Sequence, residues 1–157
     1  MLTWISNMLD RIFAVLAAIL FMQMPMFIEQ YSTRLAGHVE ELNYQTQTLQ
    51  QLATKSNKSM NAYVEKFIKS TDVDFSNQGK FMLDLEKRKE KLKHNLTSLT
   101  QANLFTRPFI FLFNSDWSIV HATCRNYQIG ISFTLESIVY ALIGVFIGYY
   151  LYKLLSS

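Results

Sequence analysis

The chain has 157 residues, enough for one soluble domain at most, and its net charge of +3 is too small to indicate a nucleic-acid-binding protein. Half of the residues are hydrophobic, and many of these lie in two blocks near the ends, which is typical of a membrane protein. The single cysteine, Cys124, excludes an internal disulfide, and the few prolines and glycines favour long helices.

The first apolar block covers residues 12–28, which is about the minimum length for a membrane-spanning helix, and we assign residues 1–30 to an N-terminal membrane anchor. Pro25 inside this block is expected to kink the helix near its far end. A cleaved signal peptide needs small residues after its apolar core, whereas bulky Met26 and Phe27 stand there. An uncleaved anchor is therefore the favoured interpretation.

Residues 31–103 have the pattern of a long antiparallel helical hairpin with coiled-coil-like packing. The first arm, Ser32 to Ser70, is about 58 Å long if it is fully helical. Its heptad seam reads Leu35, Val39, Leu42, Thr46, Leu49, Ala53, Ser56, Met60, Tyr63 and Phe67. The seam of the second arm reads Met82, Leu85, Lys89, Leu92, Leu96, Leu99 and Asn103. Turn-forming residues separate the arms, with Ser76 or Asn77 as the expected N-cap of the second.

The second arm carries a basic-rich run, Glu86 to Lys93, in which acidic residues interrupt the lysines. Residues of opposite charge are spaced three and four apart, which suits a solvated helix face. We favour this interpretation over a patch for anionic lipid or nucleic acid, because no aromatic residue is interleaved with the basic ones.

Residues 104–128 form an aromatic segment followed by a connector. Leu104 to Trp117 is apolar but too short to cross a membrane, and Arg107 and Pro108 stand near its start. Its aromatic content suits an interfacial element lying on a bilayer, and a buried element beneath the hairpin fits equally well. Ser118 to Gln128 is expected to be a short amphipathic connector.

The second apolar block, residues 129–153, is long enough to cross a membrane and carries one acid, Glu136. An ionisable group inside a membrane is costly, so Glu136 belongs either to a proton or ion relay or to a polar clamp between the two spans. A relay needs further titratable groups along its path, and neither span supplies one. We therefore favour the clamp, with Gln23 as the partner of Glu136.

Small residues on the two apolar blocks are placed to meet. Antiparallel helices bring residues to equal depth when their numbers sum to a constant. Two pairs share the sum 162, Ala14 with Gly148 and Ala18 with Gly144, and Gln23 with Glu136 gives 159. The small residues expected at the contact are Ala14, Ala18, Ser137, Ala141, Gly144 and Gly148. The alternative is that the glycine face packs against a second copy of the chain.

Both ends of the chain carry short motifs that resemble one family. They comprise Gln23, Pro25, Phe27-Ile28, Gln30-Tyr31, Arg34-Leu35, Gly37-His38 and Glu41, then Arg107-Pro108, Thr134, Glu136, Tyr140-Ala141 and Gly144 to Gly148. The resemblance is to an uncharacterised family of short two-span bacterial inner-membrane proteins, a domain of unknown function. The chain departs from the family pattern in lacking prolines between Gln128 and Ser132. The resemblance implies an architecture and a location, and no activity.

No set of catalytic or metal-binding residues stands out along the chain. His121 and Cys124 are three residues apart, but two ligands do not make a zinc site, and no acid nearby would orient the histidine as a base. We therefore expect no enzymatic activity, no cofactor, no metal and no small-molecule substrate.

The expected function is that of a membrane-anchored interaction or scaffold protein. Its partners would be the lipid bilayer and, through the hairpin, another protein or a second copy of the chain. The alternative is a small accessory subunit of a transporter or channel that uses Glu136. The expected location is the bacterial inner membrane, with cytoplasmic termini and a periplasmic hairpin, because long loops cross a membrane regardless of their charge.

Overall fold

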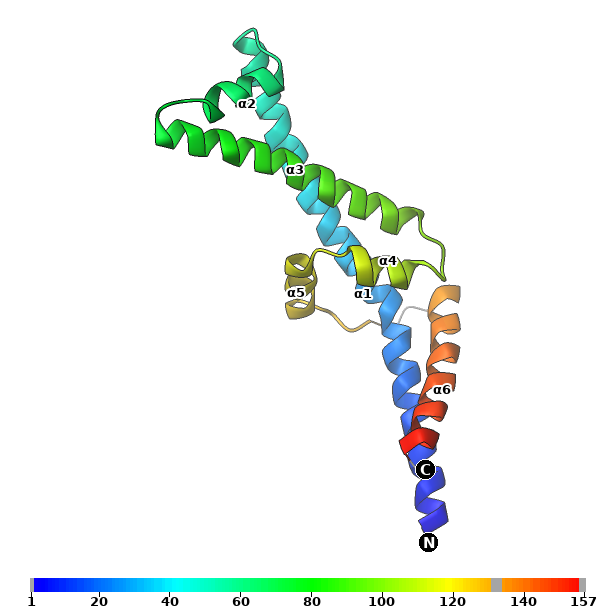
Figure 1. Ribbon diagram of the computed structural model, residues 1–157. Coiled ribbons are helices and arrows are strands. Elements are labelled where there is room, and N and C mark those ends of the chain that lie inside the picture. The colour runs from blue at the N-terminus through cyan, green and yellow to red at the C-terminus, as the bar shows by residue number, and fades with distance from the viewer. Residues whose placement is uncertain (1, 131–133, 156–157) are drawn as a thin grey trace.

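The computed structural model describes residues 2–130 and 134–155, and this part of the chain contains six helices and no strand (Figure 1). The helices are α1 (Leu2–Lys55), α2 (Met60–Ile68), α3 (Val73–Gln101), α4 (Arg107–Asn114), α5 (Trp117–Arg125) and α6 (Leu135–Leu155). The predicted all-α fold class, with apolar helices at both ends and a helical hairpin between them, is confirmed. Residues 131–133, at the predicted entry to the second apolar block, lie outside the described residues.

Helix α1 runs the length of the molecule and organises the rest (Figure 1). It continues from Leu2 to Lys55 without interruption, about 80 Å at 1.5 Å per residue, and Pro25 is buried within it. The boundary predicted after residue 30 therefore falls inside a helix. Helix α6 lies beside the first half of α1, and these two are long and apolar enough to cross a membrane.

The first arm of the hairpin is not the single helix predicted from Ser32 to Ser70. It breaks at residues 56–59, where Asn57 adopts a left-handed conformation with a φ of 53°. Serine and asparagine compete with helical hydrogen bonding through their own side chains, so the local sequence permits a break here. Ser59 then caps α2, since its Oγ accepts from the Ala62 amide at 3.3 Å.

The second arm also begins earlier than predicted. Asp72, rather than Ser76 or Asn77, is the N-cap of α3, and its Oδ1 accepts from the Asp74 amide at 2.9 Å. A carboxylate at this position also matches the positive end of the helix dipole. Helix α2 packs against the first half of α3, so the end of the long first arm finds its partner by folding back.

The predicted heptad positions form the hairpin core up to the break. Buried members of the two seams are Leu35, Val39, Leu42, Thr46, Ala53, Met82, Leu92 and Leu99. Beyond the break the pattern changes, because Ser56 is exposed and Val64 becomes the buried residue of α2. Helix α3 crosses α1 obliquely, and α4 and α5 fill the space below the crossing (Figure 1). Tyr31 and Ile28 of α1, both at most 1% exposed, connect the hairpin core to these two helices.

Helix α2 lies directly against Gly79 of α3, which leaves no space for a side chain there. A Cβ atom at this position would lie 2.5 Å from the Ile68 backbone nitrogen and 2.8 Å from Phe67 Cβ. A Cβ atom at Gly37 of α1, in contrast, would meet no atom within 4 Å. The two helical glycines therefore form a matched pair for testing the α2–α3 contact.

We predict that Gly79→Ala destabilises the protein by about 1–3 kcal/mol, because the new methyl group forces the α2 backbone away. Gly37→Ala should instead stabilise it by up to about 1 kcal/mol, through helix propensity alone. Thermal unfolding of the detergent-solubilised full chain, followed by circular dichroism, measures both. Equal melting temperatures for the two variants would contradict the close α2–α3 contact.

Candidate functional site

One arginine joins three segments of the chain where α6 begins. Arg107 is the first residue of α4, and its Nη2 lies 3.0 Å from Oε2 of Glu29 on α1. Its Nη1 lies 3.4 Å from Oε2 of Glu136, in the first turn of α6. Pro108 follows in the first turn of α4, where a helix can do without a backbone donor. The guanidinium therefore connects carboxylates from the two long apolar helices to α4.

The two salt bridges differ in solvent exposure and therefore in how much each stabilises the protein. The Arg107 and Glu136 side chains are 19% and 22% exposed, whereas that of Glu29 is 64% exposed. An exposed pair contributes at most about 1 kcal/mol, so the Glu29 bridge adds little. Removing the cation from a largely buried carboxylate costs more, because the remaining charge is left uncompensated. The Arg107–Glu136 pair is therefore the structurally important half of the bridge.

Hydrogen bonds secure the start of α6 around this pair. Thr134 occupies the N-cap position, and its Oγ1 accepts from the Ser137 amide at 3.2 Å. The Tyr140 hydroxyl, in a side chain that is 4% exposed, donates to the carbonyl oxygen of Leu104 in the loop before α4. The α3–α4 loop and the first turns of α6 therefore form one layer together with Arg107.

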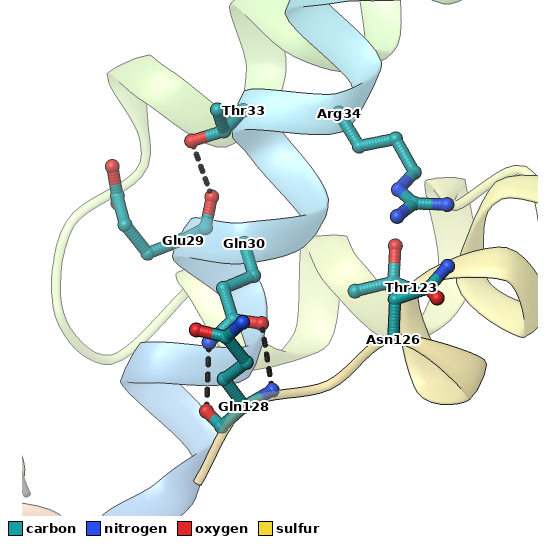
Figure 2. A pocket seen from close by; sticks show the side chains of 7 residues that line it. All are labelled: Glu29, Gln30, Thr33, Arg34, Thr123, Asn126 and Gln128. Carbon is teal, nitrogen blue, oxygen red and sulfur yellow. Dashed lines mark hydrogen bonds between the residues drawn. The ribbon is translucent and has the colours of Figure 1, made fainter. Parts of the chain in front are cut away.

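A second set of polar contacts ties the connector that follows α5 to α1. The Tyr127 hydroxyl donates to Gln23 Oε1 at 2.8 Å, and burial raises the pKa of this hydroxyl above its usual value. Gln30 Nε2 donates to the Gln128 carbonyl at 2.9 Å, and the Gln128 amide donates to Gln30 Oε1 at 3.3 Å (Figure 2). These contacts hold the connector against the side of α1.

The structure does not pair Gln23 with Glu136, and this corrects the sequence-based expectation. Gln23 binds Tyr127, and Glu136 faces Arg107. Two residues at equal depth make contact only if their side chains also point towards each other around the helix axes. Gln23 lies five residues beyond Ala18, which is about 140° around the helix and away from α6.

The small residues meet in the pairs that the numbering predicts. A Cβ atom on Gly144 would lie 2.9 Å from Ala18 Cα, and one on Gly148 would lie 2.9 Å from Ala14 Cα. Ser137 is fully buried about two turns before Gly144, and Ala141, which lies between Ser137 and Gly144, is half-buried. The backbones of α1 and α6 approach closely along this stripe, as small residues permit.

Helix α4 has one buried and one exposed face. Its Phe111 ring is buried edge-on against Phe27 and Tyr31 of α1, with centroids 5.8 and 5.2 Å away. The opposite face and the flanking turns expose large apolar side chains. They are Phe105, Phe109, Leu112, Phe113 and Trp117, each at least 51% exposed. One face of this segment is therefore a buried element below the hairpin, and the other is an uncovered aromatic surface.

The other sequence candidates do not converge on a site. His121 and Cys124 are both exposed on α5. Across residues 2–130 and 134–155, no group of three or more histidine, cysteine, aspartate or glutamate residues is arranged to hold a metal ion. The polar layer around Arg107 and the adjoining Gln30–Gln128 contact are thus the candidate functional region.

Comparison with known proteins identifies the family. The family described as "Protein of unknown function (DUF2937)" matches residues 5–157. The chain belongs to this family. No curated protein and no solved structure matches the chain. The resemblance of the two ends to an uncharacterised family is thereby confirmed, and the match extends through the hairpin that the motifs leave uncovered.

Sequence reasoning about this DUF2937 chain missed Arg107 as the partner of Glu136. Two features of the sequence point to this pair. An acid in an apolar helix needs a compensating cation, and Arg107 stands near the start of the aromatic segment. Tyr127 was missed as well, since nothing in its surroundings marks it out before the connector is folded against Gln23.

We predict that Arg107→Gln destabilises the protein by about 1–3 kcal/mol, because it leaves the Glu136 carboxylate partly buried without a cation. The double variant Arg107→Gln/Glu136→Gln should recover most of this loss, and Glu29→Gln should change stability by less than about 1 kcal/mol. Thermal unfolding in one detergent measures all three variants. A double variant as unstable as Arg107→Gln alone would show that charge compensation is not the role of the pair.

Proposed function

We propose that the protein is a membrane-anchored helical interaction protein, in which α1 and α6 hold the base in a bilayer and the hairpin binds another protein or a second copy. The apolar character of both helices supports the anchor. Large apolar side chains point outward along them, among them Val15, Leu20, Leu142, Phe146 and Leu154, each at least 57% exposed. Such a surface suits lipid rather than water.

The observation that carries the proposed interaction is the apolar surface at the far end of the hairpin. Large side chains are exposed there on α1 and α3, namely Tyr44 (69%), Leu52 (42%), Val73 (70%), Phe75 (55%) and Phe81 (55%). An open groove of about 410 Å³ between the two helices is lined by Tyr44, Leu49, Phe81 and Met82. Exposed apolar patches far from a proposed membrane anchor mark protein-binding surfaces. We propose no enzymatic reaction and no cofactor.

The alternative function, an accessory subunit of a transporter or channel, requires that Glu136 takes part in transport. The Arg107 guanidinium beside this carboxylate supports a structural clamp instead, because it supplies the compensating charge. We therefore keep this alternative only as an outcome of the experiment.

We predict that Phe75→Ser/Phe81→Ser abolishes partner binding by the full chain, because it removes apolar area from the hairpin surface. Phe109→Ser/Phe113→Ser on α4 is the matched control and should leave binding intact. The measurement is quantitative pull-down from native membranes in mild detergent. Partners that are lost only in the hairpin variant support the proposal. Partners retained equally by both variants contradict it. Co-purification of a many-span transporter, if it is lost when Glu136 is replaced, would favour the alternative function.

We further propose a bacterial inner-membrane location with cytoplasmic termini and a periplasmic hairpin. The cationic residues flanking the apolar helices are nearly balanced, with Arg11 and Lys153 on one side against Arg34 and Arg125 on the other. Residues 31–128 would therefore cross the membrane as a long segment whose charge has little influence.

The exposed thiol of Cys124 reports this orientation. A membrane-impermeant maleimide should label it in cells whose outer membrane has been permeabilised, before the inner membrane is opened. A Cys124→Ser variant controls for background labelling. Labelling that requires lysis of the inner membrane would reverse the assigned orientation.

A further inference from the structure

An open groove of about 490 Å³ runs between α1 and the end of α5 (Figure 2). Its polar walls come from Gln30, Arg34, Thr123, Asn126 and Gln128. The half-buried Arg34 side chain extends into this groove, and its guanidinium is directed towards Thr123 and Asn126 (Figure 2). In this groove the Arg34 cation therefore lies beside neutral polar groups at the end of α5, while Glu29 and Thr33 also line the α1 side.

Within the described part of the chain, the charge of Arg34 has no carboxylate partner. Among the ion pairs of residues 2–130 and 134–155, none includes Arg34, although the chain offers several carboxylates. Of the described residues that line the groove, Glu29 is the one acid, and its side chain points away from Arg34 (Figure 2). It binds Arg107 instead. Asn126 Nδ2 donates one hydrogen to the Ala122 carbonyl, which leaves its second N–H for a ligand. A guanidinium with a free amide donor is suited to an oxyanion such as phosphate.

The position of Arg34 along α1 indicates which phosphate-containing ligand could reach it. Because Gly144 lies against Ala18, the first residue of α6, Leu135, is level with residue 27 of α1. Arg34 lies seven residues farther, about 10 Å along the helix, which corresponds to the headgroup layer if the apolar helices span a bilayer. Side chains on a helix lean towards its N-terminus, which directs the guanidinium back to the bilayer side.

An apolar groove lies below the polar one. It has a volume of about 230 Å³ and is lined by Leu20, Met24, Phe27, Phe111 and Tyr127. Phe27 and Arg34 are two turns apart on one face of α1, so the two grooves follow the same side of the helix. This arrangement places a hydrocarbon-lined surface under a phosphate-binding group.

We infer that these grooves form a binding site for one anionic phospholipid, with its phosphate on Arg34 and an acyl chain against Phe27 and Tyr127. The inference rests on the proposed membrane anchoring, and it adds a specific lipid partner to it. The bound lipid would bridge α1 and the connector after α5, next to the Gln30–Gln128 hydrogen bonds.

Native mass spectrometry of the full chain in detergent, titrated with phosphatidylglycerol, tests the site. We expect Arg34→Gln to weaken phosphatidylglycerol binding about tenfold, the loss of one charge-assisted contact. Arg125→Gln, which removes an exposed arginine from the same end of α5, should bind the lipid like the unchanged protein. Melting temperatures without added lipid confirm that both variants fold.

Equal lipid binding by the unchanged protein and Arg34→Gln would overturn the inference, as would an equal loss in both variants, since that indicates non-specific charge attraction. Inorganic phosphate forms the second arm. If it raises the melting temperature as much as phosphatidylglycerol does, the ligand is not a lipid. Extraction of membranes with alkaline carbonate separates the two proposals. A chain that is washed off refutes the anchor, whereas a retained chain with undiminished lipid binding in Arg34→Gln refutes only the lipid site.

Discussion

The close backbone contact between α1 and α6 sets the level of every other element in the lower half of the molecule. Gly144 and Gly148 admit the α1 backbone at Ala18 and Ala14, and no side chain fits between. Because this contact fixes how far the two helices slide past each other, it also fixes where α6 starts. Glu136 consequently emerges beside Glu29, within reach of a single arginine. A shift of one helical turn would separate these groups by about 5 Å.

Arg107 connects the α1–α6 pair to the lower end of the hairpin. It stands at the junction between the α3–α4 loop and α4, so its ion pairs determine where the returning chain meets α1 and α6. Phe111 and Tyr31 then complete the junction through ring contacts, and the Asp116 amide donates to the Tyr31 hydroxyl at 2.9 Å. Charge compensation and apolar burial thus act at the same place, with the aromatic face of α4 left uncovered beside them.

The hairpin departs from a simple two-arm coiled coil because α3 crosses α1 obliquely and does not follow it along its length (Figure 1). The chain breaks at residues 56–59 and returns as α2, which covers the first half of α3. The remaining apolar side chains at the far end, such as Phe75 and Phe81, stay exposed, and the proposed interaction surface follows from this incomplete coverage.

The sequence by itself determined the helical class, the two apolar helices, the buried heptad positions from Leu35 to Ala53 and the pairing of Ala18 with Gly144. These features follow from periodicity and residue size, which are local properties. The tertiary structure alone decided the partner of Glu136, because Arg107 is distant in sequence and equal depth says nothing about helical angle. It also decided that the first arm breaks and folds back. Local propensities at Ser56 and Asn57 permit the break, and the folded-back α2 then packs against Gly79 of α3.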